Sequence, residues 1–153
     1  MPMPVIRLAR PDEYDEIARV WMESFVSTGL GEGSPTLLAQ LRDRVLREVQ
    51  KGWSLYAADD DGRIAAMLAL HVPDRYLDQL FVAPEYQRAG LGRRLLCFTR
   101  KKLPDEIWLR CIRENDNAWR WYEREGFVFE REAVEPMNGF TMKYYRWKKG
   151  AAR

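Results

Sequence analysis

The stretch from Ala83 to Leu96, APEYQRAGLGRRLL, holds residue types that bind phosphate groups. Gly90 and Gly92 leave room for an anion to approach the backbone, and the neighbouring arginines add positive charge. The apolar residues that follow predict a helix from about Gly90. Because a helix N-terminus carries unpaired N–H groups and the positive end of a dipole, the stretch is a candidate phosphate site. An ordinary helix start with solvated arginines is the alternative.

The sequence of this turn does not match either of two common phosphate-binding loops. A Walker loop closes with Gly-Lys-Ser/Thr, and no lysine follows the glycines here. A dinucleotide fingerprint needs three glycines in an opening strand-helix-strand unit, whereas this turn has two glycines and lies deep in the chain. We therefore exclude both kinds of nucleotide-binding enzyme.

The surrounding segments alternate between strand and helix patterns. Apolar alternation and turn residues predict seven strands, at residues 5–8, 53–58, 63–70, 76–82, 107–112, 127–132 and 140–147. Apolar residues at helical spacing predict four helices, which begin at Pro11, Pro35, about Gly90 and Asp116. Ser34 is an N-cap candidate, and the acidic turn at 59–62 favours a hairpin. The order predicts a mixed α/β domain in which the third helix crosses over between two parallel strands.

Length and composition limit the classes of protein. The 153 residues predict a single domain over 1–153, with a flexible tail at 148–153. The net charge of +2 gives no strong field that would favour nucleic acid or an anionic membrane, and a local basic patch is left open. Cys97 and Cys111 lie in apolar segments, which predicts buried thiols in a reducing compartment and no metal site. The N-terminus sustains no apolar run, so we expect a cytoplasmic protein.

Two blocks of the sequence resemble one family. Gln87-Arg88-Ala89-Gly90-Leu91-Gly92 is similar to the (Gln/Arg)-x-x-Gly-x-(Gly/Ala) signature of the GNAT family of N-acetyltransferases. After the next predicted strand, the block from Asn115 to Phe127 is similar to the family's Asn-x-x-Ala-x-x-x-Tyr-x-x-x-Gly-Phe. The predicted order of elements also resembles the family's fold over nearly the whole chain, in outline only for the first half.

The resemblance implies a GNAT fold, a mixed central sheet of about seven strands with splayed parallel central strands, flanked by about four helices. It implies acetyl-CoA as co-substrate, with its pantetheine arm along the strand 76–82 and its pyrophosphate on the glycine turn. Asn115 would cap its helix and bind the CoA arm, with a plain N-cap as the alternative. The residues assigned to acetyl-CoA are Leu80, Phe81, Val82, Gln87, Arg88, Ala89, Gly90, Leu91, Gly92, Arg93 and Asn115.

The resemblance also assigns catalytic groups. Tyr122 matches a family tyrosine near the CoA sulfur and is the general-acid candidate, with a core tyrosine as the alternative. The base would face the cleft from the strand 76–82, where Asp78 is the carboxylate candidate, and His71 is the other choice. Arg110 stands where relatives that acetylate protein N-termini often carry a glutamate, which argues against that activity.

The implied function is transfer of an acetyl group from acetyl-CoA to a primary amine of a small molecule or peptide, by direct attack through a tetrahedral intermediate. An acyl-CoA-binding sensor with weak or lost catalysis is the alternative. We expect the acceptor between the loops SFVSTGLGEGSP and AVEPMNGFTM. Candidate aromatic walls are Trp21, Phe25, Trp119 and Trp121, and candidate acidic groups are Glu32, Asp74, Asp78 and Glu135. A homodimer covered by Trp147 and the neighbouring tyrosines is a further option.

Overall fold

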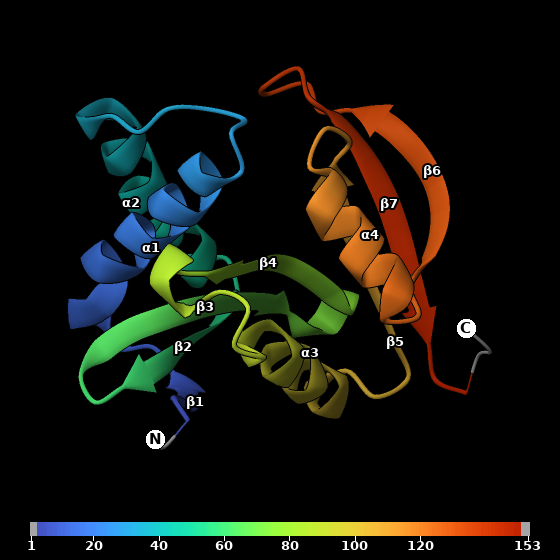
Figure 1. Ribbon diagram of the computed structural model, residues 1–153, viewed down its shortest axis with the longest axis horizontal. Helices are drawn as coiled ribbons and strands as arrows, with labels where there is room; N and C mark the ends of the chain where they lie inside the picture. The colour runs from blue at the N-terminus through green and yellow to red at the C-terminus, as the bar shows by residue number, and fades with distance from the viewer. Residues whose placement is uncertain (1–2, 151–153) are drawn as a thin grey trace.

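The computed structural model describes residues 3–150 and is built on one seven-stranded sheet in the order β1-β2-β3-β4-β5-β7-β6 (Figure 1). The strands are β1 (Val5–Leu8), β2 (Ser54–Asp60), β3 (Arg63–His71), β4 (Tyr76–Val82), β5 (Glu106–Ile112), β6 (Val128–Val134) and β7 (Thr141–Lys148). The helices are α1 (Tyr14–Ser27), α2 (Pro35–Gln50), α3 (Leu91–Lys102) and α4 (Asp116–Arg124). Short 3-10 turns lie at Pro11–Glu13, Val72–Asp74 and Pro84–Tyr86. These elements confirm the predicted order.

The sheet is split at its centre. Strands β1 to β4 form an antiparallel unit, and β5, β7 and β6 form a second one. The two units meet in one parallel pairing, Tyr76 with Trp108, and then diverge. Helix α3 provides the crossover between β4 and β5 (Figure 1). The sequence-based expectation of splayed parallel strands is therefore confirmed.

Local side-chain chemistry accounts for the predicted boundaries. Ser34 caps α2, since its hydroxyl accepts a hydrogen bond from the Leu37 amide at 3.0 Å. Asp61 and Gly62 both have positive φ, at 52° and 94°, as a two-residue turn between twisted strands requires. The Asp59 carboxylate accepts from the Gly62 amide at 2.7 Å and closes that hairpin.

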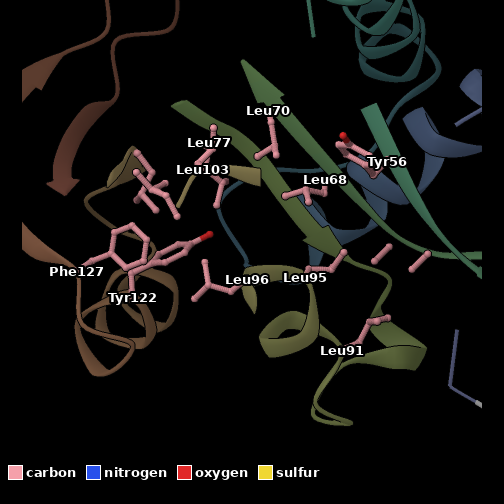
Figure 2. Packing of buried hydrophobic residues seen from close by; sticks show 14 of the residues in the cluster. Tyr56, Leu68, Leu70, Leu77, Leu91, Leu95, Leu96, Leu103, Tyr122 and Phe127 are labelled. Atoms are coloured by element: carbon pink, nitrogen blue, oxygen red, sulfur yellow. The ribbon is translucent and has the colours of Figure 1, made fainter. Parts of the chain in front are cut away.

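Two apolar cores lie on opposite faces of the sheet. Residues of α1 and α2, such as Ile17 and Val45, pack with Met67 on one face. Residues of α3 and α4, such as Leu95 and Tyr122, pack on the other face (Figure 2). Strand β3 lies between them and is buried at every position from Ile64 to Leu70, which explains its continuous apolar run.

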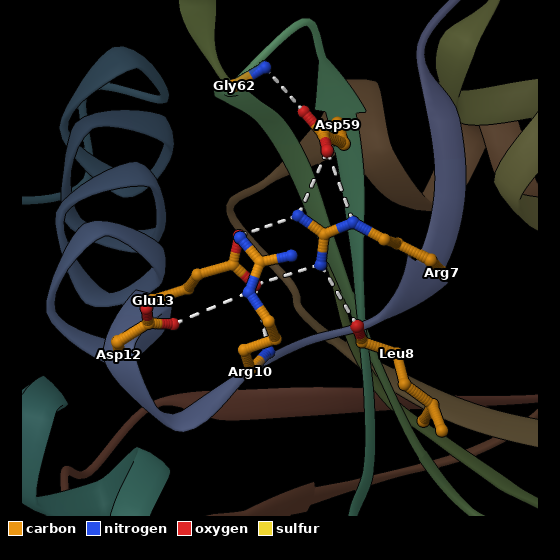
Figure 3. A network of polar contacts seen from close by, with 7 residues as sticks. All are labelled: Arg7, Leu8, Arg10, Asp12, Glu13, Asp59 and Gly62. Atoms are coloured by element: carbon orange, nitrogen blue, oxygen red, sulfur yellow. Dashed lines mark hydrogen bonds and ion pairs between the residues drawn. The ribbon is translucent and has the colours of Figure 1, made fainter.

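A charged network joins the N-terminal strand to the start of α1 (Figure 3). Arg7 donates to both carboxylate oxygens of Glu13, at 2.9 and 2.6 Å. The same guanidinium donates to Asp59 on β2, at 3.2 and 3.0 Å. The hydrogen bonds from Arg7 lower the pKa of Glu13 to about 2, against the burial of its carboxyl. The network thus fixes β1, the first helix and β2 relative to one another.

Two sequence-based expectations change in the C-terminal strand and the residues after it. Lys148 is the last residue of β7 and Lys149 donates its amide to the Asp105 carbonyl at 3.0 Å, so the proposed flexible tail at 148–153 begins too early. Residues 151–153 of that tail lie outside the described part of the chain. Tyr145, one of the tyrosines expected to cover a partner, is fully buried within its own chain.

Over residues 3–150, no helix is long and apolar enough to cross a bilayer.

Candidate active site

The split in the sheet leaves one edge of β4 without a strand partner over most of its length. Beyond Tyr76, β4 pairs only with β3, so the backbone groups that face β5 are available to a ligand. A groove of about 820 Å³ runs along this edge to the glycine turn. Of the residues predicted to bind acetyl-CoA, those that line it are Leu80, Phe81, Val82, Gln87, Arg88, Gly90, Gly92, Arg93 and Asn115.

The glycine turn has the backbone geometry of an anion site. Arg88 and Gly90 both have positive φ, at 65° and 83°, before α3 begins. Arg94 donates its amide to the Gly90 carbonyl at 3.1 Å, and the helical amides that precede it have no acceptor one turn back. Those amides and the helix dipole point at the groove's end. The side chains of Ala89 and Leu91 do not line the groove, so their predicted role is left to their backbone.

Gln87 stabilises the start of this turn. Its side-chain amide donates to the Val82 carbonyl at 3.0 Å, which ties the turn to the end of β4. This contact occupies one acceptor that the resemblance assigns to pantetheine. The amide of Gln87 is also used, since it donates to the Pro84 carbonyl at 3.3 Å.

Asn115 lies at the predicted start of α4 and lines the groove, but the expected side-chain cap is wrong. Its backbone carbonyl accepts from the amides of Ala118 and Trp119, at 3.1 and 3.3 Å. Its side chain makes no capping hydrogen bond with the described residues. The carboxamide therefore stays free for a ligand.

Tyr122 lies where the groove meets a second cavity. It is 6% exposed, packs edge-on against Phe127 at 5.4 Å between ring centroids, and lines both spaces (Figure 2). Burial raises the pKa of its phenol well above the ordinary value, with the Cys111 thiol a smaller cause. The phenol therefore keeps its proton at neutral pH and is a hydrogen-bond donor.

The second cavity has a volume of about 360 Å³ and walls that are mainly apolar. Helices α1 and α2 contribute Trp21, Phe25 and Leu41, and the hairpin loop contributes Phe140. This places the cavity between the two loops expected to enclose an acceptor. Of the predicted aromatic walls, Trp121 lines the groove instead, and Trp119 donates its indole N–H to the Arg113 carbonyl at 2.9 Å outside both spaces.

Charged side chains at this cavity are paired across elements. Arg110 on β5 donates to Glu135 at 2.6 Å and to the Tyr76 hydroxyl at 3.2 Å. Arg110 is the main cause of a lowered pKa for Glu135. Burial is the main cause of a raised pKa for Tyr76. Two of the acidic groups expected to attract an amine, Asp78 and Glu135, are thus neutralised by arginines, because Arg44 Nη2 also lies 3.8 Å from Asp78.

Asp78 faces this cavity as predicted, with hydrogen bonds already in place. It accepts from the Trp53 indole at 2.8 Å and from the Gln79 side chain at 3.0 Å. These donors stabilise the carboxylate and hold it in one orientation. His71, the other base candidate, does not line either space, and its Nδ1 lies 2.8 Å from the carboxylate of Asp74.

Sequence reasoning missed three residues that shape the cavity: Arg44, Trp53 and Gln79. Arg44 follows Leu41 by three positions and therefore lies on the same face of α2 as its apolar stripe. This position could have indicated that Arg44 faces the protein interior. Trp53 and Gln79 act through contacts with Asp78, and the Trp53 contact spans 25 residues, beyond the reach of local patterns.

The fold and this site have counterparts among known proteins. The chain matches the model of the acetyltransferase (GNAT) family over residues 14–127. It is 27% identical over 163 residues to a probable N-acetyltransferase of Mycobacterium tuberculosis, with 94% of this chain and 91% of that protein covered. It is 26% identical over 131 residues to the peptidyl-lysine N-acetyltransferase YiaC of Escherichia coli, with 80% and 82% covered.

A solved structure shows the same arrangement of elements. The PaiA N-acetyltransferase of Thermoplasma acidophilum, in complex with coenzyme A, matches with a TM-score of 0.75 at 20% identity over 97% of this chain and 99% of that one. This likeness confirms the predicted GNAT fold. The family match covers both motif blocks, from the glycine turn to Phe127. The chain is an acetyltransferase enzyme and belongs to the acetyltransferase (GNAT) family.

Proposed function

We propose that the protein transfers an acetyl group from acetyl-CoA to a primary amine of a small molecule or peptide. The observation that carries this proposal is the groove along the unpaired edge of β4, which leads from the glycine turn to Tyr122. Backbone groups of Leu80 to Val82 would bind the pantetheine amides, and the amides after Gln87 the pyrophosphate. The carboxamide of Asn115 would bind the same arm. Relatives named as N-acetyltransferases support the reaction class.

The reaction is direct attack of the neutral amine on the thioester carbonyl. A new N–C bond forms, the C–S bond breaks through a tetrahedral intermediate, and the electron pair leaves with the CoA sulfur. The nitrogen loses one more proton as the amide forms, and this proton passes through solvent to the CoA thiolate. Tyr122 donates a hydrogen bond to that sulfur as charge develops there. Since a thiol has a pKa near 8.5 and burial raises that of Tyr122, the bond to sulfur contributes more than complete proton transfer.

The amine arrives as an ammonium with a pKa near 10.4, so it must lose a proton before it attacks. We assign acceptance of that proton to Asp78, the carboxylate on the cavity side of β4. Because Trp53 and Gln79 occupy lone pairs of this carboxylate, a water molecule between amine and Asp78 suits the geometry better than direct contact.

Calorimetric titration with acetyl-CoA tests whether the protein binds this donor, and absence of binding would refute the proposed function. Release of free thiol from acetyl-CoA in the presence of an amine library tests whether the protein transfers the acetyl group to an amine. The library should contain a lysine-bearing peptide, because one relative is a peptidyl-lysine N-acetyltransferase. Tight binding without turnover of any amine would favour an acyl-CoA sensor over an enzyme.

A further inference from the structure

One arginine at the acceptor cavity has unused hydrogen-bond donors. Arg44, on α2, lies over the Trp21 ring at 5.2 Å from its centroid. Its Nη2 is 3.8 Å from Asp78, which is an ion pair but too long for a hydrogen bond. Between residues 3 and 150, we find no acceptor within hydrogen-bond distance of this guanidinium.

The other charges around the cavity are already bonded. Arg110 donates from Nε to Tyr76 and from Nη1 to Glu135, and Asp78 accepts from Trp53 and another side chain. Arg44 has the most exposed side chain of the four charged residues, with 37% exposed against 27% for Arg110, 16% for Glu135 and 10% for Asp78. Within residues 3–150, the cavity therefore offers a ligand a cationic fork, while both of its carboxylates are already paired.

We propose that Arg44 binds a carboxylate of the acceptor, which makes the acceptor an amino acid or a similar small amine with an apolar body. The inference rests on the proposed acetyl transfer and narrows its substrate class. A guanidinium presents parallel N–H groups that match a carboxylate, and the Trp21 ring lies against this guanidinium.

The rest of the cavity fits such a ligand. Phe25, Leu41 and Phe140 provide apolar walls for its body, and a volume of about 360 Å³ suits a small molecule. A zwitterion carries no net charge, and the two arginines and two carboxylates of the cavity also cancel. The carboxylate takes no part in the bond changes, so its contribution is to position the amine near Tyr122.

Matched acceptors test the proposal through kcat/KM for thiol release. The pairs are L-phenylalanine with phenethylamine, L-leucine with 3-methylbutylamine, and 6-aminohexanoate with hexylamine. We expect the carboxylate member of at least one pair to be used at least ten times better. Arg44→Met should lower that value about tenfold to a hundredfold, mainly through KM, and should reduce the preference for the carboxylate member over its carboxylate-free partner by about the same factor.

Arg42→Met is the matched control, since Arg42 is exposed on the same helix and pairs with Asp15 away from the cavity. It should keep the carboxylate preference, and both variants should bind CoA as the unchanged protein does. Equal use of both members of every pair, or an equal loss for both in Arg44→Met, would overturn the proposal.

A binding measurement separates this proposal from the proposed function. Titration of N-acetyl-L-phenylalanine, N-acetyl-L-leucine and 6-acetamidohexanoate into the CoA complex requires no turnover. Arg44→Met should weaken at least one of these affinities by tenfold or more. If no carboxylate ligand binds, or if Arg44→Met binds each of them equally well, the carboxylate site is refuted. Failure of thiol release with every amine, including the lysine peptide, would instead refute the transferase.

Discussion

Single residues at the junction of groove and cavity determine what chemistry the site can perform. Tyr122 is buried and keeps its proton, and Asn115 keeps a free carboxamide because it does not cap α4. Cys111 lies in the same region, and burial raises the pKa of its thiol to about 12. The region therefore contains a donor for a leaving group but no ready protein nucleophile.

We predict that Tyr122→Phe lowers kcat by roughly ten to a thousandfold, because the leaving sulfur loses its hydrogen-bond donor. Acetyl-CoA affinity, measured by calorimetry, should change little. Tyr145→Phe is the control, since Tyr145 is a buried tyrosine whose hydroxyl bonds Glu123 at 2.6 Å outside the site. A near-normal rate for Tyr122→Phe would remove this tyrosine from catalysis.

We expect Cys111 to form no acetyl-thioester, because at pH 8 a thiol with a pKa of about 12 is almost entirely protonated. Mass spectrometry after incubation with acetyl-CoA alone should show no added acetyl group on this residue. Of the two thiols predicted to be buried, only Cys111 is buried and Cys97 is exposed, so iodoacetamide should modify Cys97 first. Retention of kcat within about threefold in Cys111→Ala agrees with direct attack, whereas a stoichiometric acetyl group on Cys111 would contradict it.

Motif spacing predicted Tyr122, Asn115 and the glycine turn, because these roles depend on residues close together in sequence. The hydrogen-bond partners of those residues could not be predicted in the same way. The Asp78 carboxylate meets an indole from the loop before β2, and Arg44 reaches it from α2. Such contacts depend on how distant elements pack, which one sequence does not encode in any local pattern.

At the level of elements, the turn between β4 and α3 depends on one glycine more than on the other. Gly90 has a left-handed φ of 83°, whereas Gly92 lies inside α3. A methyl group at Gly92 would meet the Trp121 ring at 3.7 Å, an ordinary contact. At Gly90 no described atom lies within 4 Å of such a methyl group, so strain there comes from the backbone conformation alone.

We predict that Gly90→Ala weakens acetyl-CoA binding by about tenfold, because an alanine relaxes the free turn out of the left-handed conformation and binding must restore it at a cost of about 1–2 kcal/mol. Gly92→Ala, the matched control, should bind within about threefold of the unchanged protein. Calorimetric titration of both variants with acetyl-CoA measures these affinities. Equal affinities for Gly90→Ala and the unchanged protein would show that the turn does not need this geometry to hold the ligand.

Most elements were predictable because their signals are local, such as the Ser34 cap and the turn that ends at Gly62. The irregularities within strands were not. Register shifts occur at Ala58/Asp59 and Ala69/Leu70, where nothing in the composition distinguishes them from regular strand. They arise from the fit between neighbouring strands, so only the assembled sheet reveals them.

For the whole molecule, stability at low pH depends on the network around Arg7. The pKa of Glu13 falls from 4.5 to about 2 on folding, so the folded state binds fewer protons between these values. The carboxylate therefore stabilises the protein fully above pH 4.5. This stabilisation is lost as the pH falls toward 2.

We predict that Glu13→Gln lowers the free energy of unfolding by about 2 kcal/mol at pH 7 and flattens its decline between pH 4.5 and 2. Urea unfolding at several pH values measures both effects. Glu130→Gln is the control, because Glu130 is an exposed partner of Arg146. This substitution should change the free energy of unfolding by less than about 1 kcal/mol. If the free energy of unfolding of Glu13→Gln declined between pH 4.5 and 2 as steeply as that of the unchanged protein, the role of Glu13 in acid stability would be contradicted.

The single pairing between β4 and β5 also affects how this enzyme can change its acyl donor. In a closed sheet, the distance between neighbouring strands is held at about 4.8 Å by their ladder of hydrogen bonds. Here Leu77 and Leu109, one from each strand, line the cavity beside this separation. We expect smaller side chains at these two positions to enlarge the cavity without breaking any strand pairing. A few such substitutions should therefore admit longer acyl groups.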